Sequence, residues 1–467
     1  MTRLSFLGAA RSVTGSRFQL STGTSTLLVD CGLTQERRMQ ERNWEPFATP
    51  ADRIDEVLLT HAHLDHCGLL PRLVAKGFRG PIYATGPTAD IARIVMLDSA
   101  RLQREDAEQK ARRHEREGRR GPHPAVPLYE ERDAEAAAGL FRVVRLGEPV
   151  GLTGGAEAEF FEAGHILGSA SIRVRLGRNG SSRTVLFSGD IGRWDHPILN
   201  DPAPADRADY VLMESTYGDR RHGQESQIAD QLASIVTHTV ERGGNIVIPS
   251  FAIERSQEVL YYLNALLRDN RVPHLVVFLD SPMATRVNDV FARWPEYLDR
   301  DMRRLLQESR SPFDLPGLVL ARTREESKAI NHLSGSAIII SGAGMCTGGR
   351  VKHHLVHNVS RSESTILFVG YQAEGTLGRQ IVEGARTVRI LGETMPVRAR
   401  VERIDGFSGH ADRDELLRWA RTLRSSPRRA FVIHGEAPVA ERFRSTLGEE
   451  LGWTAEVPAP GQTVELD

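Results

Sequence analysis

The run Thr60-His61-Ala62-His63-Leu64-Asp65-His66 constrains this chain more than any other feature. It places four potential metal ligands, His61, His63, Asp65 and His66, directly after an apolar stretch at 57–59 that is typical of a buried strand. Imidazole nitrogens and carboxylate oxygens are ligands that zinc takes readily. Packed this closely at a strand end, the four groups would lack partners without a cation between them. The run therefore predicts a metal site, against the alternative of a solvated histidine-rich loop.

Composition bounds the size and the compartment of the protein. The chain has 467 residues, 40% of them hydrophobic, which suits a sizeable core and about two or three domains. A net charge of -1 neither favours nor excludes a nucleic-acid partner. Cys31, Cys67 and Cys346 are widely spaced without a C-x-x-C pair, so we expect buried thiols, with Cys67 a weak candidate ligand. The absence of a signal-like N-terminus or a bilayer-length apolar stretch predicts a cytoplasmic protein.

Apolar runs predict an α/β fold. Short strand-like runs lie at 4–7, 18–20, 26–29, 56–59 and 81–83, and again at 157–162, 170–176 and 184–187. Longer periodic segments at 69–76 and 88–109 predict helices between the two series. From about residue 225, helix-length segments at 225–242, 253–268 and 350–359 alternate with apolar runs at 245–248, 275–279, 337–340 and 365–369. This alternation is typical of βαβ units around a parallel sheet. A strand at 401–404, a helix at 412–423 and a strand at 429–433 follow.

The segment 110–127 is basic and then rich in proline. It holds Lys110, Arg112, Arg113, Arg116, Arg119 and Arg120, followed by Gly121, Pro122, Pro124 and Pro127. It is interpreted either as a solvated helix end running into an exposed loop or as a mobile basic flap beside a polyanionic substrate.

Further polar groups follow other predicted strands. These are Asp30, His165, Asp190, Glu214 and His434. Residues at successive strand ends converge on one rim of the sheet in many α/β folds, so these side chains can meet in space. With the opening run, His165, Asp190 and His434 make seven potential ligands, more than one four-coordinate zinc ion can use. We therefore predict two ions that share a bridging carboxylate.

These residues resemble a known family. Asp30, the H-x-H-x-D-H run, His165 and Asp190 resemble the metallo-β-lactamase superfamily. Glu214 in Glu-Ser-Thr-Tyr-Gly, His410 in Phe-Ser-Gly-His-Ala-Asp and His434 in Val-Ile-His-Gly-Glu resemble its β-CASP branch, which processes nucleic acids. The stretches 249–255, 341–350 and 370–378 also resemble that branch. Within it, the chain resembles bacterial and archaeal homologues of the endonuclease subunit of the eukaryotic pre-mRNA 3′-end cleavage factor.

The resemblance implies a domain organisation and a set of ligands. An αββα sandwich would be built from residues 1–218 and 405–467, with a parallel-sheet α/β β-CASP domain at 219–404 inserted and capping the active site. A first zinc ion would be held by His61, His63, His165 and Asp190. A second would be held by Asp65, His66, Asp190 and His434, with Asp30 orienting ligands rather than binding an ion.

The resemblance also implies zinc-dependent hydrolysis of single-stranded RNA to a 5′ phosphate and a 3′ hydroxyl. His434 favours RNA, because DNA-processing members carry an apolar residue there. Asp65, Glu214 and His410 are the expected catalytic residues, with His410 as proton donor and Glu214 orienting it. A helix-capping His410 is the alternative. Expected substrate contacts are Ser408, Arg255, Gly344 and Gly348.

Several alternatives remain open from the sequence. Endonucleolytic cleavage is favoured, with 5′-exonucleolytic action not excluded. The rivals are a DNA nuclease, a hydrolase of small esters or thioesters, and a catalytically silent scaffold subunit. The sequence does not decide on a homo-oligomer or on RNA sequence preference, and its histidine-rich ligand set favours zinc over manganese without proving it.

Overall fold

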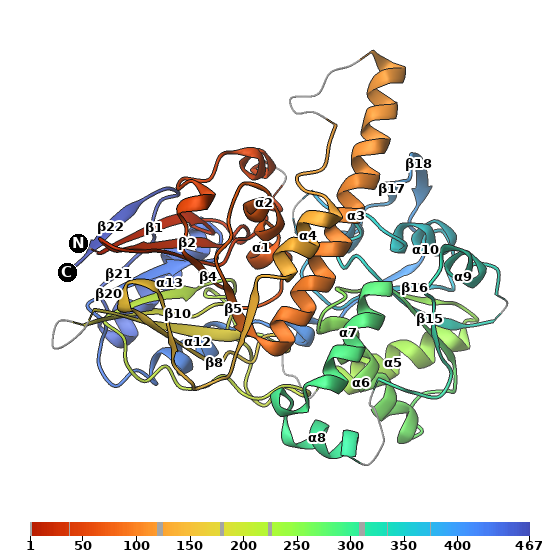
Figure 1. Ribbon diagram of the computed structural model, residues 1–467. Helices are drawn as coiled ribbons and strands as arrows, with labels where there is room; N and C mark the ends of the chain where they lie inside the picture. Colours follow the sequence, from red (N-terminus) through yellow and green to blue (C-terminus); the bar gives the residue numbers. More distant parts are fainter. Residues whose placement is uncertain are drawn as a thin grey trace. The chain divides into compact units, whose positions relative to one another are not determined.

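The computed structural model describes residues 2–36, 38–118, 125–177, 182–222, 227–307, 313–333, 335–373 and 375–467 (Figure 1). It divides into two compact units. The first comprises Met1–His196, Asn200–Arg221 and His410–Asp467, and the second comprises Pro197–Leu199 and His222–Gly409. Some residues singled out from the sequence lie outside the described ranges: Arg119, Arg120, Gly121, Pro122, Pro124 and Glu374.

The first unit contains two seven-stranded mixed sheets. The first sheet has the order β22-β1-β2-β3-β4-β5-β6. Its strands are β1 (Thr2–Gly8), β2 (Arg17–Ser21), β3 (Thr26–Val29), β4 (Glu56–Leu58), β5 (Ile82–Thr85), β6 (Phe141–Val144) and β22 (Thr463–Leu466). The second sheet has the order β21-β20-β11-β10-β9-β8-β7. Its strands are β7 (Val150–Gly151), β8 (Glu157–Glu162), β9 (Ala170–Leu176), β10 (Arg183–Phe187), β11 (Tyr210–Glu214), β20 (Arg429–Ile433) and β21 (Ala455–Glu456).

The core of this unit lies between the two sheets. Phe6 and Phe18 of the first sheet belong to one buried cluster with Phe187 and Phe431 of the second. The rings of Phe6 and Phe431 have centroids 5.0 Å apart, a normal packing distance for aromatic pairs. Large apolar side chains at alternate strand positions therefore hold the sandwich together.

Helices cover the outer faces of the sandwich (Figure 1). Beside the first sheet lie α1 (Leu64–Cys67), α2 (Leu70–Ala75), α3 (Gly86–Glu117) and α4 (Glu131–Ala138). Against the second sheet, α12 (Arg413–Ala420) and α13 (Ala437–Leu451) bury Trp419 and Phe443 beside Met213. The four layers confirm the predicted αββα sandwich.

The second unit is built on an all-parallel sheet of six strands in the order β14-β13-β15-β12-β16-β19. The strands are β12 (Ile246–Pro249), β13 (Val276–Asp280), β14 (Leu318–Leu320), β15 (Ala337–Ser341), β16 (Thr365–Phe368) and β19 (Arg400–Arg403), with a separate hairpin of β17 (Thr387–Ile390) and β18 (Glu393–Pro396). The strands β12, β15 and β16 are buried along their whole length, as expected for a parallel sheet covered on both faces. The parallel-sheet α/β prediction is therefore confirmed.

Seven helices of the described chain belong to this unit. They are α5 (Ile228–Glu241), α6 (Arg255–Arg268), α7 (Pro282–Arg293), α8 (Arg300–Gln307), α9 (Arg324–Ile330), α10 (Val351–Asn358) and α11 (Leu377–Val382). Ile330, Leu355 and Ile381, from α9, α10 and α11, share one buried cluster on one face of the sheet. The connections through α9 and α10 run toward β19 along the sheet, whereas those through α6 and α7 run toward β14. Because βαβ crossovers are right-handed, α6 and α7 cover the face opposite to α9 and α10.

The basic segment begins inside α3. This helix starts after Thr85, whose side chain accepts a hydrogen bond from the Thr88 N–H, and ends at Gly118 with φ 61. It is longer than the predicted segment at 88–109, and 110–116 forms its last turns. Arg112 pairs there with Glu108 four residues earlier, so part of the positive charge is neutralised along the helix. Among the described helices, none combines the length and hydropathy that crossing a bilayer requires.

Candidate metal centre

The predicted ligands lie at the carboxyl ends of strands from both sheets of the first unit. His61 and His63 follow β4, and Asp65 and His66 lie in the short helix α1 that comes next. The remaining ligands follow strands of the second sheet: His165 after β8, Asp190 after β10 and His434 after β20. Because the two sheets are packed face to face, these strand ends meet at one end of the sandwich.

One cluster contains His61, His63, His165 and Asp190. His63 Nδ1 lies 3.1 Å from His61 Nε2 and 3.2 Å from His165 Nε2. His61 Nε2 lies 3.4 Å from Asp190 Oδ2. Four zinc ligands with bonds of 2.0–2.1 Å lie about 3.3 Å apart along the edges of a tetrahedron. The spacing of these donor atoms therefore suits one four-coordinate zinc ion.

A second cluster contains Asp65, His66 and His434. His434 Nε2 lies 3.2 Å from His66 Nε2 and 3.3 Å from Asp65 Oδ2. These spacings again match neighbouring ligands of one small cation.

Asp190 faces both clusters. Its Oδ2 lies near His61 and His165, whereas its Oδ1 lies 3.5 Å from His66 Nε2 and 3.5 Å from His434 Nδ1. Oδ1 is buried and has no hydrogen-bond partner among the described residues. An unpaired buried carboxylate oxygen is costly, and a cation on that side would remove the cost. The residues therefore fit a pair of metal ions bridged by Asp190.

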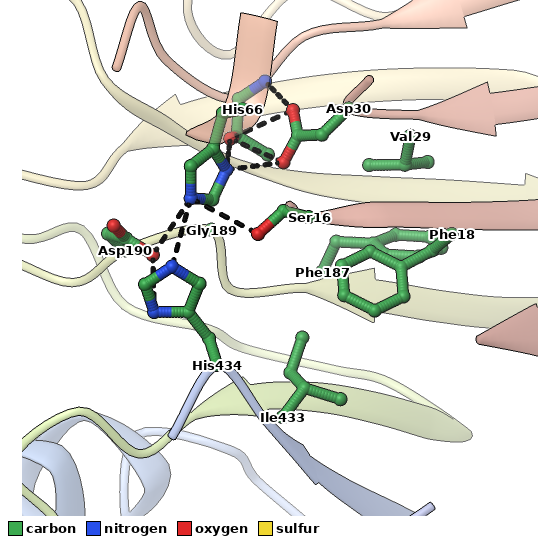
Figure 2. A pocket seen from close by; sticks show the side chains of 11 residues that line it. Ser16, Phe18, Val29, Asp30, His66, Phe187, Gly189, Asp190, Ile433 and His434 are labelled. Atoms are coloured by element: carbon green, nitrogen blue, oxygen red, sulfur yellow. Dashed lines mark hydrogen bonds and ion pairs between the residues drawn. The ribbon is translucent and has the colours of Figure 1, made fainter. Parts of the chain in front are cut away.

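Asp30 fixes the orientation of His66. Figure 2 shows the His66 ring between Asp30 and His434, with His66 Nδ1 2.8 Å from Asp30 Oδ2. Thr60 in turn donates to Asp30 from its backbone N–H at 2.8 Å and from its hydroxyl at 2.9 Å. A carboxylate on the outer nitrogen is the usual partner of a metal-binding histidine, because it directs the other nitrogen toward the ion.

His434 is held in a similar way, from its own strand end. Its Nδ1 lies 3.1 Å from the Thr216 hydroxyl, and its Nε2 faces the second cluster. His434 has φ 49 and Asp30 has φ 60, a left-handed conformation that is uncommon for residues other than glycine. Such backbone strain is concentrated at functional sites, where surrounding contacts maintain it.

Burial sets the protonation of several ligands. Desolvation lowers the pKa of His63 to about 4, and burial together with the neighbouring His66 holds the pKa of His61 well below its usual value. Burial would raise the pKa of Asp190, but His434, His66 and His61 outweigh it and hold that pKa well below its usual value. At neutral pH His61 and His63 are therefore neutral imidazoles beside the ionised Asp190 carboxylate. These are the forms that bind a metal.

His410 lies beside the clusters and is paired with Glu214. His410 Nδ1 is 3.2 Å from Glu214 Oε1, and the fully buried Glu214 also accepts hydrogen bonds from the N–H groups of Ile191 at 2.8 Å and Thr216 at 3.1 Å. Burial lowers the pKa of His410, but Glu214 and Asp190 outweigh it and raise that pKa above its usual value. The helix N-cap of α12 is Asp412, whose side chain accepts from Asp414 and Glu415, so His410 is not the capping residue.

The four predicted substrate contacts belong to the second unit. Arg255, the first residue of α6, is buried, pairs with Glu258, and lies with its guanidinium 5.9 Å from the Phe407 ring centroid. Ser408 follows the turn at Asp405–Phe407, and Gly344 and Gly348 lie between β15 and α10. Glu258 therefore neutralises the Arg255 guanidinium within the second unit.

Several residues of the centre were not predicted from the sequence. Thr60, Thr216 and Ser16, whose hydroxyl lies 3.3 Å from His66 Nε2, support ligands without being ligands. Serine and threonine at strand ends have many uses, so nothing in the sequence distinguishes these three. Cys67 is not in either cluster, because its buried thiol points to the Ala62 carbonyl at 3.5 Å.

Comparison with known families divides the chain into three matched segments. Residues 18–217 match the metallo-beta-lactamase superfamily, residues 256–381 match the Beta-Casp domain, and residues 394–458 match the Zn-dependent metallo-hydrolase RNA specificity domain. A solved structure of a protein of unknown function from Enterococcus faecalis V583 has a TM-score of 0.55 with 12% identity, over 100% of both chains, so the two share a fold.

Curated relatives match over most of the chain. It is 39% identical to Ribonuclease TTHA0252 of Thermus thermophilus over 92% of both chains. It is 32% identical to Transcription termination factor FttA of Methanosarcina mazei, over 96% of this chain and 69% of the relative. The chain therefore belongs to the metallo-β-lactamase superfamily, in its β-CASP branch, and is a homologue of a ribonuclease.

Proposed function

We propose that this protein hydrolyses phosphodiester bonds of single-stranded RNA, using two zinc ions, to give a 5′ phosphate and a 3′ hydroxyl. The observation that carries the proposal is that Asp190 belongs to one donor cluster and faces the other, and is also grouped with the His410–Glu214 pair. Small-ester hydrolysis has no need for such a pair. The match to the RNA specificity domain and the ribonuclease relative support RNA as the substrate. Endonucleolytic action remains the favoured mode.

The ligand roles follow the two clusters. His61, His63, His165 and Asp190 would hold one ion, and Asp65, His66, Asp190 and His434 would hold the other. Bound zinc would supply Lewis-acid activation of water and of the scissile phosphate. Asp30, Thr60 and Thr216 would keep the imidazole nitrogens directed at the ions.

His410 would protonate the departing 3′ oxygen. Glu214 lies against its Nδ1, so Nε2 would be the nitrogen that passes a proton to the substrate. The raised pKa of His410 favours its protonated form, which is the form that a general acid requires. Glu214 is in turn fixed by two backbone N–H groups, so its carboxylate stays in place while the proton moves.

Incubation of the purified protein with 5′- and 3′-labelled RNA and DNA of the same sequence tests the proposal. We expect cleavage of single-stranded RNA that stops with chelator and returns with zinc, and new 5′ ends that a phosphatase can dephosphorylate. Equal cleavage of DNA, or hydrolysis of small esters without any RNA cleavage, would contradict it. The ratio of internal to terminal products from the two labels separates endonucleolytic from 5′-exonucleolytic action.

The domain division at 218/219 and 404/405 stays part of this proposal, as does a cytoplasmic location. Cys31, Cys67 and Cys346 are free and buried, which suits a reducing compartment.

A further inference from the structure

Phe251 and Tyr371 are the only Phe, Tyr or Trp residues of the described chain with exposed side chains. Their exposed fractions are 38% and 42%. An exposed aromatic ring gives up the stabilisation that burial of its surface would provide. Two such rings in one unit, with all others at least partly buried, therefore suggest a ligand.

The two rings emerge from the same edge of the parallel sheet. Phe251 lies two residues beyond β12, and Tyr371 lies three residues beyond β16. The strands pair in parallel with Val247 opposite Ile366, and the same register continued places Phe251 level with Gly370, the residue before Tyr371. This is the carboxyl edge, where ligands of open α/β sheets bind.

Phe251 also lies beside the point where the connections of the sheet diverge, between β12 and β15. The chain leaves β12 through α6 toward β13, and leaves the adjacent β15 through α10 toward β16. These two connections run in opposite directions along the sheet. Such a reversal marks the usual binding position in open α/β sheets.

The backbone of two glycines packs against the Phe251 ring. A Cβ on Gly344 would lie 2.8 Å from Phe251 Cδ2, and one on Gly370 would lie 3.6 Å from Cε2. The buried Gln372 side chain donates to the carbonyls of Gly344 at 3.0 Å and Gly370 at 3.2 Å, which ties both loops together. The ring is therefore held by backbone on one side, while more than a third of its surface stays open.

The surroundings suit a nucleic-acid strand. In the described ranges, the backbone N–H groups of Gly344 and Gly348 donate to no other residue, so they can meet phosphate oxygens. Every base has a π face, and proteins hold single strands by stacking successive bases on aromatic side chains. A partner that bound only through aliphatic side chains would require neither two exposed aromatic rings nor the N–H groups beside them.

We propose that Phe251 and Tyr371 form a stacking platform for bases of the single-stranded RNA substrate. The proposal rests on the ribonuclease function proposed above and adds which side chains bind the RNA strand. Because stacking accepts every base, the platform gives affinity with little sequence preference.

Binding to two RNA probes tests the platform. All binding is measured by fluorescence anisotropy with zinc-loaded protein carrying His410→Ala, so that the probes stay intact. One probe is a labelled single-stranded RNA, and the other is an abasic ribose-phosphate strand of the same length. We expect Phe251→Leu and Tyr371→Leu each to weaken binding of the base-bearing strand about 5- to 100-fold and to leave the abasic strand unaffected. Phe251→Tyr and Tyr371→Phe should bind like the parent.

The control is Leu333→Ala, which removes an exposed aliphatic side chain from the same unit and should change neither affinity. The platform is refuted if the leucine variants bind base-bearing RNA as tightly as the parent, or lose both probes equally. A wild-type protein that cleaves RNA while the leucine variants bind normally refutes the platform alone. A wild-type protein that neither binds nor cleaves RNA refutes the proposed function together with it.

Discussion

His66 illustrates how far its neighbours decide what a single side chain can do. Its Nδ1 is engaged by Asp30, so only Nε2 is available to the cluster with His434 and Asp65. The position of Asp30 after a strand predicted that it lies near the other ligands, and its role in orienting them was implied by the family resemblance. The Thr60 hydroxyl, which touches both Asp30 oxygens, was not predictable, because its role depends on a distance across the sheet.

Asp30→Asn should lower zinc affinity about 10- to 100-fold, because the amide cannot hold the His66 ring as the carboxylate does. Competition with a chromogenic chelator measures the effect. Asp209→Asn is a matched control, since this carboxylate accepts from the Thr184 N–H at the start of β10 and touches neither cluster. Equal zinc affinity of the wild type and the Asp30 variant would contradict the assignment.

His410→Ala should reduce RNA cleavage about 10²- to 10⁴-fold, which is the usual contribution of a general acid. Zinc content, measured by atomic emission, should stay at the wild-type level because the proposed ligands are untouched. A variant that loses zinc would show His410 to be a ligand instead. A variant that cleaves normally would leave the donor unassigned.

At the scale of elements, two glycines bring the ligand-bearing loops close to the sheets. A Cβ on Gly32 would lie 1.6 Å from the Asp65 carbonyl oxygen, and one on Gly192 would lie 1.8 Å from the Gly164 carbonyl oxygen, beside His165. Each loop can therefore occupy its place only if the facing residue has no side chain.

Gly32→Ala should displace α1 and weaken the cluster containing Asp65 and His66, whereas Gly192→Ala should displace His165 and weaken the other. Zinc stoichiometry and affinity, measured by calorimetric titration, should fall in both variants. Gly23→Ala, where a Cβ meets nothing within 4 Å, is the control. Full zinc binding by both substituted proteins would show that the loops adapt.

In the second unit, Asp280 joins several elements at the end of β13. Its carboxylate accepts from Arg350 at 2.7 Å and from Ser327 at 2.6 Å, and lies 2.6 Å from His354 Nε2. Burial would raise the pKa of Asp280, but hydrogen bonds from His354, Ser327 and Arg350 outweigh it and hold that pKa below its usual value. The cluster fixes the start of α10, and with it the loop that carries Gly344.

Asp280→Asn should cost about 3–5 kcal/mol of stability at neutral pH, since it leaves buried partners uncompensated. Because the folded-state pKa is lowered, the stabilisation is present above the unfolded carboxyl pKa of about 3.9 and is lost as pH falls through the folded value. Chemical unfolding between pH 7 and pH 3 should therefore show the variant and wild type converging in acid. Asp301→Asn, in an exposed pair with Arg304, should change little. A constant difference at every pH would contradict the role of the Asp280 charge.

The sequence predicted most strands and the helices α2, α3, α5, α6, α10 and α12, because apolar runs and turn residues there are clear. It did not predict α1, α4, α7, α8, α9, α11 and α13 or the β17–β18 hairpin. In this hairpin β17 is exposed at alternate positions and β18 at three of its four positions. Its turn includes Leu391 at φ 50, and no continuous apolar run marks the hairpin in the sequence. The exposure of Phe251 was equally invisible, since an aromatic residue after a buried strand is usually part of a core.

At the scale of the whole molecule, all seven proposed ligands belong to one compact unit and Asp280 belongs to the other. The family resemblance predicted that one domain is inserted into the other. Apolar patterning alone could not predict this, because no local sequence pattern marks the return of the chain to its first domain. Two compact units can unfold in separate steps.

Removal of zinc with a chelator should lower the melting temperature of the first unit and leave that of the second unchanged. Ligand binding at a thousand times its dissociation constant stabilises a fold by about 4 kcal/mol, and the apoprotein loses that contribution. Scanning calorimetry with and without chelator, repeated with Asp280→Asn, should show two transitions that respond to different perturbations. Equal shifts of both transitions on zinc removal would contradict the placement of all ligands in one unit.

The pairing of β1 with β22, and the supply of His434 by β20, have a consequence for synthesis on the ribosome. The opening histidines emerge early, but β1 waits for a neighbour more than 450 residues later, and the second cluster waits for residue 434. From residue 190 until residue 434 is made, a nascent chain therefore carries six of its seven proposed ligands and lacks only His434. The order of synthesis therefore completes the first cluster before the second, and it delays the proposed two-ion centre until residue 434 has emerged.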